Sequence, residues 1–135
     1  TADALRQETP MTGLARPWIV AVGHRPYDDI VEAAKLFQKY NVDVYVAGHK
    51  HSYVRSNGGK YGNDTIYVVA GGAGCDEMKQ GVEEFSGKGV PALHQVAVTS
   101  ARYSSGVMTT NATHLYWELL DSVTGEVLDA VELSK

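Results

Sequence analysis

Residues 17–48 read PWIVAVGHRPYDDIVEAAKLFQKYNVDVYVAG, and this stretch decides the fold. It contains two short, β-branched apolar runs, 17–23 and 42–48, each closed by a glycine, which is typical of strands covered on both faces. Between them, apolar residues recur every three or four positions over 30–40, after an aspartate that can cap a helix and before Asn41, which can end it. The sequence therefore predicts a strand–helix–strand unit with parallel strands and a right-handed crossover.

The pattern changes after residue 48. A glycine-rich loop is predicted at 56–63, a further strand at 65–70 and a polar loop at 79–91. Four later segments are typical of antiparallel strands, the last two joined by a turn at 121–125: 93–98, 106–110, 114–120 and 127–133. The predicted fold class is α/β, with one βαβ unit followed by mostly antiparallel strands.

Composition narrows the possible classes of protein. The chain has 135 residues, 44% of them hydrophobic, and a net charge of −4, which is ordinary for one globular domain and excludes wholesale disorder. The sequence has no stripe of basic residues of the kind that binds nucleic acids. It also has no apolar run that approaches the roughly 18 residues of a membrane span. Because the first residue is Thr1, we expect the chain to be cut from a longer one.

Histidines follow both strands of the βαβ unit. His24 comes after Gly23, His49 comes after Gly48, and His51 lies two positions further on. Parallel strands end at the same edge of a sheet, where ligands of α/β proteins gather, so we expect His24 and His49 to lie side by side. Imidazole is a common metal ligand, and residues two apart in an extended segment point the same way. The sequence predicts a metal site formed by these three histidines.

Four segments carry a family resemblance. Gly-His-Arg-Pro lies within residues 18–27, Gly-His-Lys-His within 39–53, a glycine-rich strand end within 67–75, and Asn-Ala-Thr-His within 111–118. In this order they resemble segments of the purple acid phosphatases. The resemblance implies a calcineurin-like metallophosphoesterase: an αββα sandwich with a dinuclear metal centre that hydrolyses phosphate monoesters. By the family's pattern, His24 and His49 would bind a divalent ion (zinc, manganese or iron), and His51 would bind the second ion, which is ferric in the purple enzymes.

The family's carboxylate motifs have no match here: the chain contains no Asp-x-Gly, Asp-x-His, Gly-Asp-x-x-Tyr or Gly-Asn-His. Three neutral histidines cannot neutralise two multivalent cations. Residues 1–135 therefore resemble only the C-terminal portion of the catalytic domain. We expect the N-terminal half of the same enzyme, as a separate chain, to complete the centre.

Several further residues carry expectations. Tyr53 and Arg55 follow the histidine loop and could face the phosphate of a substrate. Asn63 and Asn111 begin glycosylation sequons, which favours a secreted, lysosomal or vacuolar protein. Cys75, the single cysteine, is either a buried apolar residue or half of a bridge to another chain.

Two other functions remain open at this point. The chain could be a non-catalytic binding or scaffold subunit that retains the phosphoesterase fold. It could also be a self-contained hydrolase with one zinc ion on three histidines. Metal analysis and the activity of the chain alone distinguish these alternatives.

Overall fold

The computed structural model describes residues 16–26, 30–59, 65–74 and 94–135. The predicted helix cap at Asp28 or Asp29, the loop at 79–91, Cys75 and Asn63 lie outside these residues. In chain order the elements are β1 (Val20–Val22), α2 (Val31–Lys39), β2 (Val44–Ala47), β3 (Tyr53–Gly59), β4 (Ile66–Ala70), β5 (His94–Ser100), β6 (Ser104–Thr110), β7 (His114–Asp121) and β8 (Val127–Ser134).

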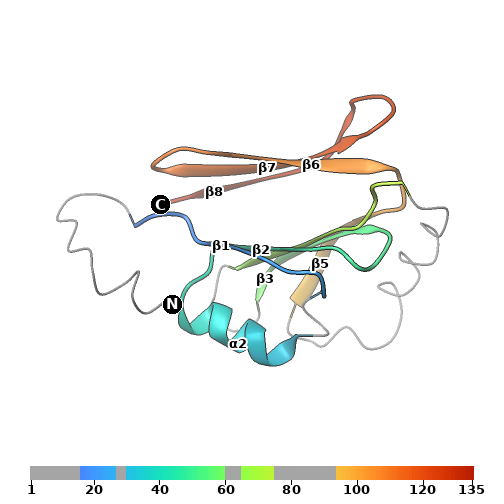
Figure 1. Ribbon diagram of the computed structural model, residues 1–135. Helices are drawn as coiled ribbons and strands as arrows, with labels where there is room; N and C mark the ends of the chain where they lie inside the picture. The colour runs from blue at the N-terminus through green and yellow to red at the C-terminus, as the bar shows by residue number, and fades with distance from the viewer. Residues whose placement is uncertain (1–15, 27–29, 60–64, 75–93) are drawn as a thin grey trace.

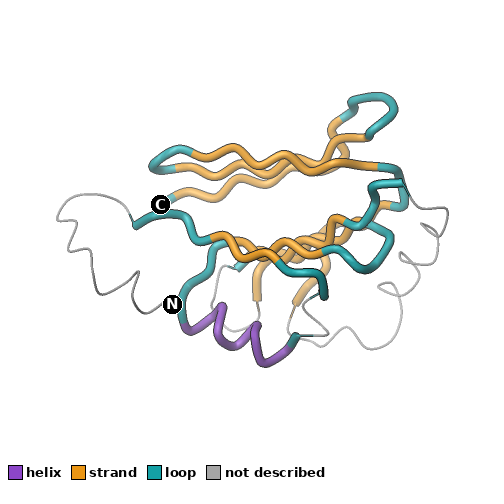
Figure 2. Tube along the Cα trace, in the orientation of Figure 1, coloured by secondary structure: helices purple, strands orange, loops and turns teal. Residues whose placement is uncertain are grey.

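Two sheets form the body of the structure. The first has the strand order β1-β2-β4-β3-β5, in which β1, β2 and β4 are parallel and β3 is antiparallel to both its neighbours. The second is an antiparallel sheet in the order β6-β7-β8. The sheets face each other as two layers, and α2 covers the opposite face of the first sheet (Figures 1 and 2). This confirms the predicted α/β class, with a βαβ unit followed by mostly antiparallel strands.

Successive side chains of the strands point to opposite faces of the first sheet, so the first sheet has a buried cluster on each face. Val44 and Val68 face the second sheet, where they pack in one cluster with Leu115, Trp117 and Leu119 of β7. Every second residue of β7 is buried in this way because successive side chains of a strand point to opposite faces. The layer between the sheets is therefore a packed core made mainly of apolar side chains.

The helix covers the other face. Ala34 of α2 packs with Tyr45, Ala47 and Tyr67, and Phe37 lies half-buried against this cluster. At its end the backbone N–H of Tyr40 donates to the carbonyl of Leu36, and the next residue, Asn41, has a φ of 48°, a left-handed conformation common after helices. The predicted stop at Asn41 is thus confirmed.

One prediction was wrong. Residues 56–63 were expected to be a loop, but β3 continues to Gly59 by pairing with β5, while its pairing with β4 ends at Arg55; residues 60–63 lie outside the described part of the chain. Its register with β5 shifts between Arg55 and Ser56 and again between Ser56 and Gly59. Such bulges accommodate residues of low strand propensity, so ladder pairing outweighs the loop composition. None of the helical residues described forms a segment long and apolar enough to cross a membrane.

Candidate metal centre

The loops that follow β1 and β2 lie against each other. The two strands pair in register from Val20 with Val44 to Val22 with Val46, so they end at the same edge. The backbone N–H of Gly23 donates to the carbonyl of Val46 at 3.0 Å, and that of Gly48 donates to the carbonyl of His24 at 3.2 Å. Backbone hydrogen bonds therefore fix the positions of both Gly-His segments relative to one another.

This arrangement brings His24 and His49 together. The Nε2 atom of His24 lies 3.1 Å from the Nδ1 atom of His49, and the ring centroids are 5.0 Å apart. Both side chains are exposed. His49 has a φ of 65°, and this left-handed turn directs the chain away from the strand immediately after Gly48. The convergence expected from the parallel strands is therefore present.

The spacing of these two nitrogens suits one metal ion. Two nitrogen ligands at about 2.05 Å from an ion lie about 2.9 Å apart at a right angle and about 3.3 Å apart in a tetrahedron. The observed 3.1 Å falls between these values. The pair fits the donor set of a zinc, iron or manganese site as far as two ligands can.

His51 lies half-buried in the loop between Gly48 and β3. Two tight backbone bonds shape this loop, from Lys50 N–H to the Gly48 carbonyl and from Ser52 N–H to the Lys50 carbonyl, each 2.8 Å. Within the described residues, no group of three or more His, Cys, Asp or Glu side chains is arranged to hold a metal ion. The structure thus pairs two of the three predicted ligands and does not add the third to a common group.

Gly71 lets the strand end of β4 approach this loop. Its N–H donates to the carbonyl of Ser52 at 3.0 Å, and a Cβ atom on Gly71 would overlap the backbone carbonyl of Lys50. A side chain at this position would displace the loop that carries His49 and His51. The glycine is therefore required by the close contact between two backbone segments.

Arg25 contacts the pair formed by His24 and His49, a contact that the sequence did not predict. Its Nη1 atom lies 2.9 Å from the Nε2 atom of His49. Tyr45, whose pKa is raised by burial, donates its hydroxyl proton to the carbonyl of Arg25 at 2.6 Å, and Pro26 is fully buried. The backbone that carries Arg25 is thus anchored on both sides. Its position directly after His24 was the only signal available.

Tyr53 and Arg55 do not face this edge. They lie buried between the sheets, where the Tyr53 hydroxyl donates to Oδ2 of Asp129 at 2.6 Å and accepts a 3.0 Å bond from Nε1 of Trp117. Arg55 donates from Nε and Nη2 to the same carboxylate at 2.6 and 2.8 Å. The expectation that these side chains face a phosphate is corrected: they join β3 to β8 across the core.

Burial and hydrogen bonding shift the pKa values of Asp129 and Tyr53. Burial raises the pKa of Asp129, but the hydrogen bonds from Arg55 and Tyr53 outweigh it, so the carboxyl keeps a pKa below its usual value. Burial first, and then the bond to Asp129, raise the pKa of Tyr53. The pair is therefore ionised, and the phenol is neutral, at neutral pH.

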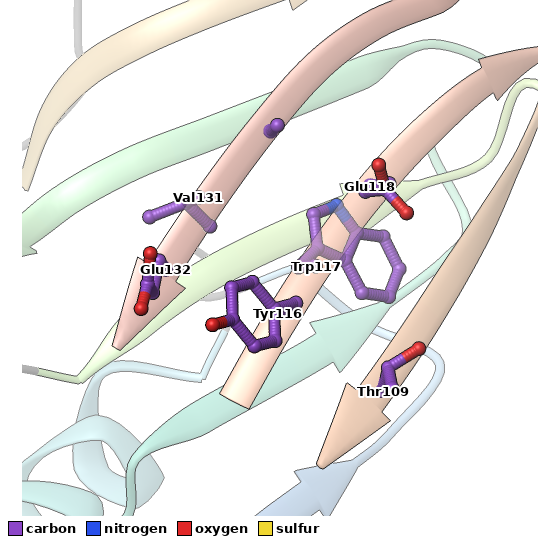
Figure 3. Close-up of a pocket in the computed structure, with 7 residues that line it drawn as sticks. Thr109, Tyr116, Trp117, Glu118, Val131 and Glu132 are labelled. Carbon is purple, nitrogen blue, oxygen red and sulfur yellow. The ribbon is translucent and has the colours of Figure 1, made fainter. Parts of the chain in front are cut away.

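The remaining histidines lie on other strands. His94 begins β5, and His114 begins β7, where its ring stacks on Tyr116 at an interplanar angle of 13°. A pocket of about 470 Å³ lies near Tyr116, and Figure 3 shows the side chains of β6, β7 and β8 that line it: Thr109, Tyr116, Trp117, Glu118, Ala130, Val131 and Glu132. The histidine pair does not contribute to this pocket.

The sequon at Asn111 lies in the exposed turn between β6 and β7. The side-chain oxygen Oδ1 of Asn111 accepts bonds from the N–H groups of Thr113 and His114 and from the Thr113 hydroxyl. The indole of Trp18 donates to the Asn111 carbonyl at 2.8 Å. All these bonds use oxygen, so none of them engages Nδ2, the atom to which a glycan is attached.

Comparisons with known proteins cover nearly the whole chain. Residues 5–53 match the family model "Calcineurin-like phosphoesterase", and residues 64–130 match "Iron/zinc purple acid phosphatase-like protein C". The chain is 27% identical to acid phosphatase type 7 of Danio rerio over 99% of this chain and 38% of that protein. It is 28% identical to an acid phosphatase of Aspergillus ficuum over 88% of this chain and 24% of that protein.

The fold has a counterpart of known structure. A purple acid phosphatase from seeds of yellow lupin (Lupinus luteus) superimposes with a TM-score of 0.65 and 21% identity, covering 98% of this chain and 27% of that one. The chain thus spans less than two-fifths of the length of the proteins it matches. With two family models in sequence order and the same fold, the chain belongs to the purple acid phosphatase and calcineurin-like phosphoesterase family.

Proposed function

We propose that this chain is the C-terminal portion of a metal-dependent acid phosphatase that hydrolyses phosphate monoesters. The observation that carries the proposal is the 3.1 Å approach of His24 Nε2 to His49 Nδ1 at the strand-end edge, in a chain of this family. The spacing suits two ligands of one cation, and the edge is where α/β proteins bind their substrates.

In this proposal the residues of the chain bind and orient. His24 and His49 hold one divalent cation (zinc, manganese or iron), and His51 holds the second, an iron ion. The bound cations supply the Lewis acidity that polarises a phosphate ester. Gly71 and the backbone bonds of the 48–52 loop keep the imidazoles in place, and the exposure of both rings leaves the edge open to substrate.

The remaining ligands would come from another polypeptide. Two multivalent cations need carboxylates, and the described residues hold no metal-binding group of three or more side chains. β1 is an edge strand of the first sheet, and its Val20 and Val22 side chains are 39% and 77% exposed. We propose that the N-terminal half of the same enzyme, present as a separate chain, pairs with this edge, covers the valines and supplies the carboxylates.

The proposed location is the secretory pathway, leading to secretion or to a lysosome or vacuole. The exposed sequon at Asn111, with its Nδ2 not engaged by the turn, supports this location.

Hydrolysis of p-nitrophenyl phosphate tests the function. The protein should contain this chain together with the segment that supplies the remaining ligands, which is called the intact protein below. We expect metal-dependent hydrolysis that His49→Ala reduces by at least about a hundredfold, because even the loss of a residue that only orients a metal ligand costs about 10- to 100-fold, while His114→Ala retains the activity. Absence of both metal and hydrolysis in the intact protein would favour the non-catalytic alternative, and full activity of the isolated chain would favour the mononuclear one.

A further inference from the structure

Arg25 and a metal ion compete for the same histidine. The contact between Nη1 of Arg25 and Nε2 of His49 is 2.9 Å, a hydrogen-bond distance. A guanidinium carries only donors, so Nε2 of His49 must accept with its lone pair. A neutral imidazole has one such lone pair, and therefore the proton of His49 lies on Nδ1.

The second contact of His49 agrees with this assignment. Its Nδ1 atom, now a donor, faces Nε2 of His24 at 3.1 Å, which accepts. The chain of donors runs from Arg25 through His49 to His24. In this state the nitrogen of His49 that lies beside His24 carries a proton and is not available to a cation.

Binding of a cation between the two rings requires the other tautomer. Nδ1 must present its lone pair to the ion, so its proton moves to Nε2, and no proton is gained or lost overall. Nε2–H then faces the donors of Arg25, and two donors repel. A cation shared by the two histidines therefore excludes the contact between Arg25 and His49.

We propose that a divalent cation displaces Arg25 from His49 and that the released guanidinium binds the phosphate group of the substrate. This inference rests on the proposed function. The backbone of Arg25 is held in place, because the Tyr45 hydroxyl donates to its carbonyl at 2.6 Å and the following Pro26 is fully buried, so the released guanidinium stays within side-chain reach of the histidine pair. A guanidinium presents several N–H groups in a plane, which suits the oxygens of a phosphate. Cation binding would thus prepare the anion site.

Calorimetric titration of the intact protein with Zn²⁺, and of the zinc-loaded protein with inorganic phosphate, tests the two steps. Arg25→Met removes the donors at nearly constant length. We expect it to bind Zn²⁺ about fivefold or more tightly, because a charge-assisted competitor for the lone pair is lost. We expect it to bind phosphate about tenfold more weakly, because one bidentate partner is lost.

Lys50→Met is the matched control, since it removes one positive charge from the residue next to His49. Lys50 is half-buried beside His49, so a general effect of lost positive charge would act through it as well, whereas the competition for Nε2 of His49 predicts a Zn²⁺ affinity within about twofold of the wild type. If Lys50→Met and Arg25→Met gained Zn²⁺ affinity equally, the cause would be a general effect of charge, and the proposed competition would be overturned. Unchanged phosphate affinity in Arg25→Met would overturn the second step.

Nitrogen NMR of the metal-free wild type provides a readout without a variant. We expect His49 to be protonated on Nδ1 and not on Nε2. The opposite tautomer would refute the competition. If the wild type takes up no metal and hydrolyses no phosphate ester, the proposed function fails and this inference fails with it. If the wild type does both and Arg25→Met behaves as the wild type, only this inference fails.

Discussion

Arg55 and Asp129 form a two-pronged ion pair between the facing sheets, although 74 positions separate them in the chain. Their side chains are only 10% and 5% exposed. A buried pair of this kind is worth little relative to apolar residues of the same volume, but the loss of one partner leaves an uncompensated buried charge. The pair therefore specifies how β3 and β8 pack, and removal of either partner is expected to destabilise the fold.

Replacement of Asp129 by Ala is expected to lower the free energy of unfolding by about 3–5 kcal/mol, because Arg55 remains buried without its partner. Urea unfolding of the intact protein at pH 7 measures this. Glu32→Gln breaks the exposed Glu32–Lys35 pair on α2 and serves as control, with an expected cost below about 0.5 kcal/mol. A cost below about 1 kcal/mol for Asp129→Ala would contradict the role given to the pair.

Acid is expected to destabilise the protein through the same carboxyl. Because the pKa of Asp129 is lower in the folded than in the unfolded state, its contribution is fully present above the unfolded value of about 3.9 and is lost as pH falls through the folded value. Unfolding free energies measured from pH 7 to pH 3 should fall below about pH 4 in the wild type. Asp129→Asn should reduce this slope, and identical slopes would refute the assignment.

Gly71→Ala is expected to disturb the histidine loop. The added Cβ would overlap the Lys50 carbonyl, so the loop must shift, at a cost of about 1–3 kcal/mol as in other overpacked sites. Metal affinity should fall as well, because the same loop carries His49. Gly48→Ala is the control, since no atom lies within 4 Å of its added Cβ. Similar stability and metal affinity in the two variants would show that the close approach is not required.

Asn111 is expected to carry an N-linked glycan when the intact protein is made in the secretory pathway. Its side chain is exposed, and the turn uses its oxygen only. Peptide mass spectrometry after deglycosylation with a glycosidase in heavy-oxygen water should show a labelled aspartate at this position. Thr113→Ala should abolish the label. An unmodified Asn111 in the secreted wild type would contradict the prediction.

The parts of the fold that depend on local pattern were predictable. The βαβ unit at 17–48 and the meeting of His24 with His49 follow from apolar periodicity and from the rule that parallel strands end together. The continuation of β3 to Gly59 was not predictable, because it depends on pairing with β5, a strand about forty positions further along the chain, which outweighs the low strand propensity of the glycines.

The contacts of two arginines could not be predicted from local sequence patterns either. Arg55 was assigned to the substrate because it follows the histidine loop, but its partner Asp129 lies in the last strand, and only the packing of the sheets brings them together. Arg25 contacts His49 because β1 and β2 are neighbours, which the sequence implied, but the direction of a long side chain depends on local geometry. The pairing of β1 with β2 could therefore be inferred, and the side-chain partners could not.

Metal content measured by plasma mass spectrometry tests the central claim most directly, namely that His24 and His49 are ligands of one cation. The intact wild type is expected to contain about two metal ions per molecule. His24→Ala and His49→Ala should each lose at least one of them, and His114→Ala, on β7, should keep both. Wild-type metal content in both His24→Ala and His49→Ala would contradict the account.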